Sequence, residues 1–139
     1  LFASRDSREL QAEEQQLAHA LARLLGDLGI SEAVEWRESS RACFLTLFSL
    51  GASHWKIPLN EASWGYLWMW AENQVLAAIK LVPLGQTSGQ KILSSAIAII
   101  PELVSTGLSL KDENIGYTAP GQGIASALHE TQYSRLFRS

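Results

Sequence analysis

The stretch Glu61–Leu81, EASWGYLWMWAENQVLAAIKL, contains three of the five tryptophans of the chain and no proline or other helix breaker apart from Gly65. At 100° per residue, one face of the expected helix holds Trp64, Leu67, Trp68, Ala71, Val75 and Ala78. The opposite face holds Tyr66, Met69, Trp70, Asn73 and Ala77, with Lys80 at its end. A helix that is apolar on both sides is either central in its domain or covered by a partner chain. Both interpretations remain open from sequence.

Further helices are expected on both sides of this stretch. The first, Ser4–Leu25, has an apolar stripe at three- and four-residue steps and ends at Gly26 and Gly29; the stripe consists of Leu10, Leu17, Ala18, Leu21, Leu24 and Leu25. Before the aromatic helix we expect a helix over Ser39–Ala52, capped by Ser39 or Ser40, and an extended link at His54–Pro58. After it the chain breaks at Pro83 and Gly85, and helices follow over Gln86–Ile99 and Pro101–Leu108. A loop over Ser109–Gly123 then leads to a last helix from about Ile124. No stretch alternates with the period of a strand. The sequence therefore predicts an all-α protein, a compact multi-helix bundle with a C-terminal tail.

Composition narrows the class of function. The 139 residues suit one core-forming chain, and the net charge of −3 argues against a nucleic-acid binder. The single cysteine, Cys43, lies in an apolar run, which predicts a buried structural thiol and a cytoplasmic, reducing location. Charged residues interrupt every long apolar stretch, so no membrane association is expected.

No local motif indicates catalysis or a bound cofactor. Gly85–Lys91 resembles a phosphate loop only faintly, because its spacing is wrong and no strand precedes it. The three histidines, His19, His54 and His129, are far apart in sequence, and His19 is expected to be solvated. We therefore expect no enzyme, no catalytic residues and no intrinsic cofactor, with His129 as a weak candidate for a metal ligand.

The last eleven residues, HETQYSRLFRS, are different in kind. They combine Tyr133, Phe137 and two arginines, the residue types that dominate binding hot spots, and have little bulk to form a core. If the segment is helical, His129 and the two aromatic residues lie on one side at four-residue steps. The prediction is a partner-binding tail consisting of His129, Glu130, Gln132, Tyr133, Arg135, Leu136, Phe137 and Arg138. The alternative is that this segment docks on its own domain.

The segment Ile124–Ser139, IASALHETQYSRLFRS, resembles the C-terminus of the urease accessory protein UreF family. The resemblance continues in Ala71–Leu93, AENQVLAAIKLVPLGQTSGQKIL, and in Ser4–Leu25, SRDSRELQAEEQQLAHALARLL. Two departures from the family pattern are an N-terminal portion that this chain lacks and Leu128, where family members often carry arginine.

The resemblance implies an all-helical protein that forms a homodimer, binds the accessory protein UreD/UreH and helps to recruit the GTPase UreG. The assembly would handle nickel and deliver it to apo-urease. The GTPase UreG would bind and hydrolyse GTP, and this chain would modulate that hydrolysis. The tail would contact UreD/UreH. The candidate GTPase-facing or dimer surface consists of Glu72, Lys80, Gln86, Tyr66 and Trp70. The expected domains are residues 1–110, a helical UreF-like domain, and residues 111–139, a loop, short helix and binding tail.

Two other functions stay open at this point. The chain could bind nickel directly, as a metallochaperone using His129, Cys43 or His54. It could also be a structural dimerisation module that associates through the Tyr66/Trp70 side or the Trp64/Trp68 side of the aromatic helix.

Overall fold

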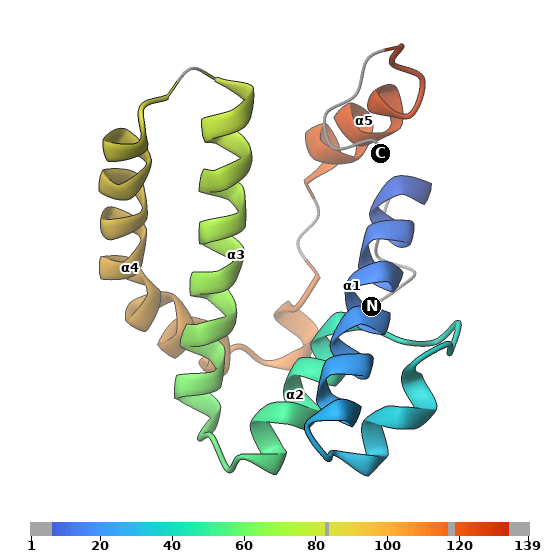
Figure 1. Ribbon diagram of the computed structural model, residues 1–139. Helices are drawn as coiled ribbons and strands as arrows, with labels where there is room; N and C mark the ends of the chain where they lie inside the picture. Colours follow the sequence, from blue (N-terminus) through green and yellow to red (C-terminus); the bar gives the residue numbers. More distant parts are fainter. Residues whose placement is uncertain (1–6, 83, 117–118, 134–139) are drawn as a thin grey trace. The chain divides into compact units, whose positions relative to one another are not determined.

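The computed structural model describes residues 7–82, 84–116 and 119–133, and all regular elements in these ranges are helices (Figure 1). The prediction of an all-α protein is confirmed. The chain divides into two compact units: unit 1 consists of residues 1–57 and 118–139, and unit 2 consists of residues 58–117. Unit 1 is therefore assembled from both ends of the sequence.

The core of unit 1 forms where α1 (Arg8–Asp27), the 3-10 helix η2 (Ser31–Trp36) and α2 (Phe44–His54) pack together. Its central side chains are small or aliphatic and wholly enclosed: Ala22, Leu25, Ile30, Ala33 and Leu47. Leu21, Trp36 and Leu50 cover this cluster from its edges. The sequence pattern did not predict η2, whose six residues are too few to show a helical period.

The end of α1 is specified by a glycine, as predicted. Gly29 adopts φ +93°, its N–H donates to the Gly26 carbonyl at 3.1 Å, and the Ile30 N–H donates to the Leu25 carbonyl at 3.0 Å. This is the Schellman arrangement, in which a residue after the helix turns back and packs on its last turn. Leu25 and Ile30 meet in the core as that arrangement requires.

The predicted apolar stripe of α1 is only partly correct. Ala18, Ala22 and Leu25 are buried, whereas Leu17 and Leu24 are about half exposed. The buried face is rotated toward alanines because these small side chains let η2 and α2 approach the helix closely. Ser4, the predicted first residue, lies outside the described residues, and the N-cap is Ser7, whose hydroxyl accepts the Leu10 N–H at 3.3 Å.

The predicted start of α2 at Ser39 or Ser40 is wrong. The helix begins at Phe44, and its first free N–H is capped by Glu14 of α1, whose carboxylate accepts the Phe44 N–H at 2.8 Å. The same Oε1 atom also accepts the Cys43 thiol at 3.1 Å. Glu14 is almost fully buried, and a carboxylate near a helix N-terminus is favoured by the helix dipole. A cap supplied from 30 residues away leaves no local signal.

The end of α2 uses the same turn as α1 without a glycine. Lys56 adopts φ 55°, its N–H donates to the Ser53 carbonyl at 3.0 Å, and the Ile57 N–H donates to the Ala52 carbonyl at 2.9 Å. The left-handed conformation is costly for a residue with a Cβ atom. The predicted extended link His54–Pro58 is therefore a helix end with a tight turn.

Unit 2 is a helical hairpin of α3 (Leu59–Leu81) and α4 (Gln86–Ser109), which run side by side in opposite directions (Figure 1). The prediction for α3 is confirmed to within two residues. Gly89 packs tightly against α3, since a Cβ atom there would overlap the Ile79 side chain and would lie 3.3 Å from Val75 Cγ1. Leu93, Ile100 and Val104 complete the buried seam on α4.

The predicted break between two helices at Ile99–Pro101 is wrong, because α4 continues through Pro101 as one 24-residue helix. Proline removes one hydrogen bond of the helix. Ile100 and Val104, on either side of it, are buried in the hairpin, and this packing keeps the helix continuous. Among the described residues, α4 alone is long and apolar enough to cross a bilayer by length and composition, and 17% of its apolar window is buried. Mostly buried core helices pass the same test.

The chain after the hairpin contains a short 3-10 helix, η3 (Asp112–Asn114), and the last helix, α5 (Pro120–His129). The predicted loop over Ser109–Gly123 is thus shorter than expected. Helix α5 begins four residues before the expected Ile124, with Pro120 in its first turn, where the missing N–H of proline is not needed.

Candidate functional site

The hairpin leaves a large amount of apolar surface open. Among the described residues of unit 2, fourteen large apolar side chains are between 38% and 67% exposed: Leu59, Trp64, Trp68, Trp70, Leu76, Leu81, Val82, Ile92, Ile97, Ile99, Leu103, Leu108, Leu110 and Ile115. Eleven of them lie on α3 and α4. Single exposed apolar residues are ordinary, but a concentration of this size on two adjacent helices is typical of a surface that another protein covers.

The predicted GTPase-facing or dimer residues all lie on this hairpin. Trp70 is 56% exposed, Lys80 and Gln86 are exposed, and Tyr66 and Glu72 are half-buried. Trp64 and Trp68, on the other predicted side of α3, are both more than one third exposed. Within α3 only Val75 is fully buried, so both faces of the aromatic helix remain accessible in the isolated chain.

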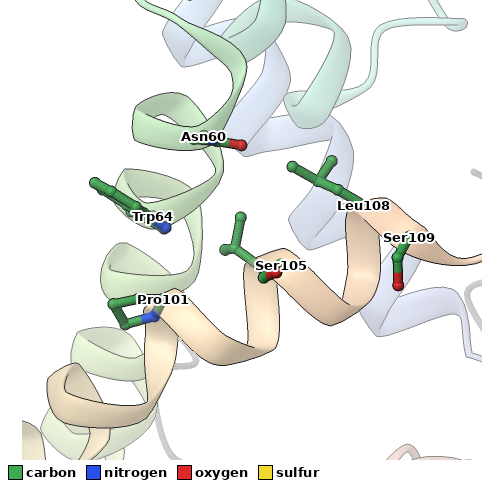
Figure 2. A pocket seen from close by; sticks show the side chains of 7 residues that line it. Asn60, Trp64, Pro101, Ser105, Leu108 and Ser109 are labelled. Atoms are coloured by element: carbon green, nitrogen blue, oxygen red, sulfur yellow. The ribbon is translucent and has the colours of Figure 1, made fainter.

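A cavity of about 310 Å³ lies between the first turns of α3 and the last turns of α4. Figure 2 shows Asn60 and Trp64 on one side and Pro101, Ser105, Leu108 and Ser109 on the other, and Val104 completes the lining. None of these side chains titrates, so the cavity offers neither an acid nor a base, and its lining is a mixture of apolar and hydroxyl side chains. The sequence does not predict this cavity, because its lining comes from two helix ends that are far apart in the chain.

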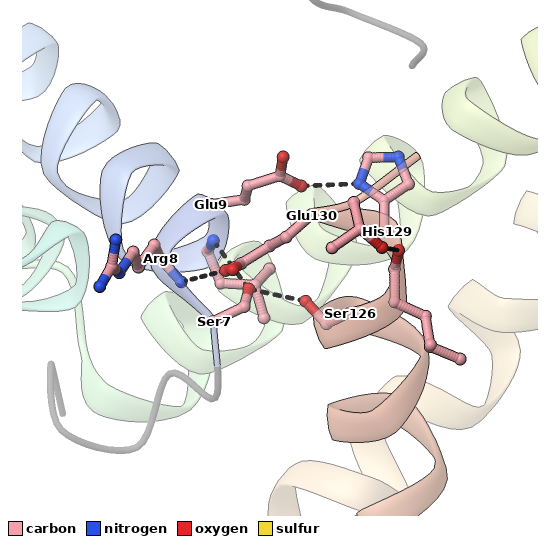
Figure 3. Close-up of polar contacts among 9 residues, drawn as sticks. Ser7, Arg8, Glu9, Ser126, His129 and Glu130 are labelled. Carbon is pink, nitrogen blue, oxygen red and sulfur yellow. Dashed lines mark hydrogen bonds and ion pairs between the residues drawn. The ribbon is translucent and has the colours of Figure 1, made fainter. Parts of the chain in front are cut away.

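The tail begins at the end of α5, and two of its residues contact α1 of the same unit (Figure 3). His129 Nδ1 lies 2.6 Å from Glu9 Oε2, and Glu130 Oε1 accepts the Arg8 N–H at 2.7 Å. One turn earlier, the hydroxyls of Ser126 and Ser7 are 2.7 Å apart. We call these six residues the clasp: Ser7, Arg8, Glu9, Ser126, His129 and Glu130.

The rest of the tail divides at Ser134. Gln132 is exposed and Tyr133 is fully exposed. The predicted binding residues Arg135, Leu136, Phe137 and Arg138 lie outside the described residues. Leu128 and Ile124 are each 63% exposed on α5, which has no fully buried residue.

The candidate metal ligands are in different environments. Cys43 is buried, as predicted, and donates its thiol to Glu14. His129 is paired with Glu9, and His54 is exposed with its ring edge-on to Trp55. His19 is not solvated as expected: it is half-buried and its Nε2 lies 3.0 Å from the Ser39 carbonyl. In the described ranges no three His, Cys, Asp or Glu side chains gather closely enough to hold a metal ion.

Comparison with known proteins gives a consistent result. The family model UreF matches residues 1–97. The chain is 51% identical over its whole length to the urease accessory protein UreF of Alkalilimnicola ehrlichii and 46% identical to urease accessory protein UreF 2 of Brucella anthropi. It is also 44% identical to the urease accessory protein UreF of Hahella chejuensis.

These relatives are longer than this chain, which spans 61% of the length of the first two and 62% of the third. Their names describe accessory proteins and not enzymes. The family match covers more than half of the chain, and the identity to each relative extends from its first residue to its last. The helical architecture, the whole-length identity and the family match together place this chain in the urease accessory protein UreF family.

Proposed function

We propose that this chain acts in the cytoplasm as a scaffold in nickel incorporation into urease, without chemistry of its own. In this proposal it binds UreD/UreH through its tail, forms a homodimer, and presents the complex to the GTPase UreG, whose GTP hydrolysis it modulates. The complex handles nickel and delivers it to apo-urease, and GTP is bound by the partner GTPase. The observation that carries the proposal is the whole-length identity to proteins named as urease accessory proteins.

The surface of the hairpin supports a role in protein assembly. Exposed tryptophans and aliphatic side chains on α3 and α4 provide the apolar area that protein interfaces bury, and Trp and Tyr are enriched at hot spots. Glu72, Lys80 and Gln86 add polar groups on the same hairpin, which suits the rim of an interface.

The tail supports the second interface. Tyr133 is fully exposed at the point where the tail leaves α5, and the residues that follow include two arginines and a phenylalanine. These side chains supply large contact areas and multidentate hydrogen bonds at low entropic cost.

The experiment is a co-purification of this chain with UreD/UreH, comparing the intact tail with Arg138→Ala and with deletion of residues 133–139. Both variants are expected to lose the partner while their far-ultraviolet circular dichroism stays unchanged. Full recovery of the partner by the deleted protein contradicts the tail assignment. Equilibrium dialysis with nickel tests the alternative: tight stoichiometric binding by the chain alone, lost in His129→Ala, would replace the scaffold proposal with direct nickel handling.

A further inference from the structure

The clasp joins the first turn of α1 to the last turn of α5 across about 120 residues of sequence, and its three bonds are polar. Figure 3 shows the two helix ends facing each other, with Ser126, His129 and Glu130 directed at Ser7, Arg8 and Glu9. Because α5 has no fully buried side chain, apolar packing contributes little to holding it in place. The position of α5 on unit 1 therefore depends on these polar contacts.

The Arg8–Glu130 contact has a defined direction, whereas in the Ser7–Ser126 contact either hydroxyl can donate. When the Glu9 carboxylate is ionised it can only accept, and the imidazole of His129 is then the donor at Nδ1. The Arg8 N–H is one of the free donors at the start of α1, and the Glu130 carboxylate accepts it where the helix dipole favours a negative charge. Ser7 is the N-cap of α1 and also contacts Ser126. The end of α5 thus completes the cap of α1.

We propose that the clasp is a positioning device: it holds α5 on α1 and so fixes the point from which the tail, from Thr131 onward, leaves unit 1 toward its partner. His129 and Glu130 are then positioning residues bound to their own chain, and the partner-binding part of the tail begins after them. The effect of the clasp on partner binding rests on the proposed function of the tail, whereas the existence of the clasp is tested without any partner.

When the start of a binding segment is already held in place in the free protein, the segment loses less conformational entropy on association, and the complex is more stable. Solvent-exposed ion pairs and hydrogen bonds are individually weak. His129 and Glu9 are 42% and 33% exposed, so the device should be easily opened and its loss should weaken the partner complex without abolishing it.

The Arg8 amide is a direct reporter of the clasp, because its acceptor is on the other helix. Its hydrogen exchange with water is measured by NMR in the 139-residue chain, in wild type, Ser126→Ala and His129→Gln. Neither substitution touches Arg8 or Glu130, so faster exchange at Arg8 shows that the contacts open together. We expect exchange to be about two- to fivefold faster in both variants. Gln122→Ala, at an exposed position of α5, is the matched control and should leave the rate unchanged.

The consequence is tested by the affinity for UreD/UreH of Glu9→Gln and Ser126→Ala, neither of which changes the tail. Both should bind about two- to fivefold more weakly, whereas Glu13→Gln, the same change at an exposed position of α1, should bind as wild type.

Each result has one meaning. An unchanged Arg8 exchange rate in both variants overturns the clasp. Faster exchange with unchanged affinity overturns its positioning role. If deletion of residues 133–139 leaves affinity intact, the proposed function of the tail fails, and the exchange result still decides whether the clasp exists.

Discussion

The carboxylate of Glu14, in the middle of α1, accepts the backbone N–H of Phe44 at 2.8 Å and so caps a helix that begins 30 residues later. A buried N–H that loses its acceptor costs about 1–3 kcal/mol. Glu14→Ala should therefore lower the free energy of unfolding in urea by about that amount, and Glu14→Gln by less, because its amide oxygen can still accept. Glu13→Ala, on the exposed side of the same turn, is the control. Equal stabilities of the two alanine variants would contradict the capping role.

Lys56 holds a left-handed conformation at the end of α2, where most helices that end this way have glycine. Lys56→Gly should raise the free energy of unfolding by about 1 kcal/mol, because the Cβ strain is relieved. Lys56→Ala keeps the Cβ atom and separates this effect from loss of the charge. The strain interpretation is wrong if alanine stabilises as much as glycine.

Gly89 and Gly107 lie on the same helix in opposite environments. A Cβ atom at Gly89 meets Ile79 and Val75, whereas one at Gly107 meets nothing within 4 Å. Gly107→Ala should stabilise unit 2 by about 0.5–1 kcal/mol through helix propensity. Gly89→Ala has the same gain in helix propensity, but the added methyl group overpacks the hairpin. This substitution should be destabilising by about 1 kcal/mol or more. Thermal unfolding of the two variants decides this, and similar stabilisation in both would show that the helices can separate slightly without loss.

Glu32 has a pKa below its ordinary value, first because its carboxylate accepts a backbone hydrogen bond and then because the Ser31 hydroxyl donates to it at 2.9 Å. A lowered pKa in the folded state means that the ionised form stabilises the fold. This contribution is present above the ordinary value of about 4.3 and is lost as the pH falls through the lowered value. Ser31→Ala should move the pKa part of the way back up in an NMR titration of the carboxyl carbon, whereas Ser53→Ala should leave it unchanged. No rise in Ser31→Ala would exclude the hydroxyl as a cause.

Trp70 is the most exposed tryptophan of α3, on one of the two sides predicted for self-association. A charge placed in a packed interface is strongly unfavourable, so Trp70→Glu should lower the mass measured by sedimentation equilibrium if this side self-associates. Trp68→Glu tests the opposite side in the same way. A dimer that persists in Trp70→Glu and dissociates in Trp68→Glu would move the interface to the other face.

The sequence predicted those features that depend on local patterns. Helix α3 follows from the aromatic and aliphatic periodicity, the end of α1 from Gly29, and the burial of Cys43 from its apolar neighbours. Where the prediction was wrong, a distant residue decides the structure. Helix α2 begins at Phe44 because Glu14 accepts the N–H of that residue. Helix α4 continues through Pro101 because it packs against α3 on both sides of the proline.

The candidate site shows the same division. The composition of the tail and of α3 predicted partner-binding surfaces, and this stays a prediction. The predicted residues of α3 lie on the hairpin, and His129 and Glu130 of the tail lie at the end of α5. The contacts of His129 and Glu130 with α1 could not be predicted, because their partners are separated by more than 100 residues and no periodicity links them.

The discontinuous construction of unit 1 has a consequence for how its weak clasp stays closed. Unit 2, residues 58–117, is inserted between the two segments of unit 1. This covalent connection keeps α5 at a high effective concentration near α1. The entropic penalty of such a closure grows slowly, by about 0.6 kcal/mol for each doubling of the loop. Lengthening the α3–α4 turn should thus leave the clasp nearly unaffected. After a single proteolytic cut in that turn, only the packing of α3 against α4 would still join the two pieces, and α5 with its tail could dissociate on dilution once that packing opens.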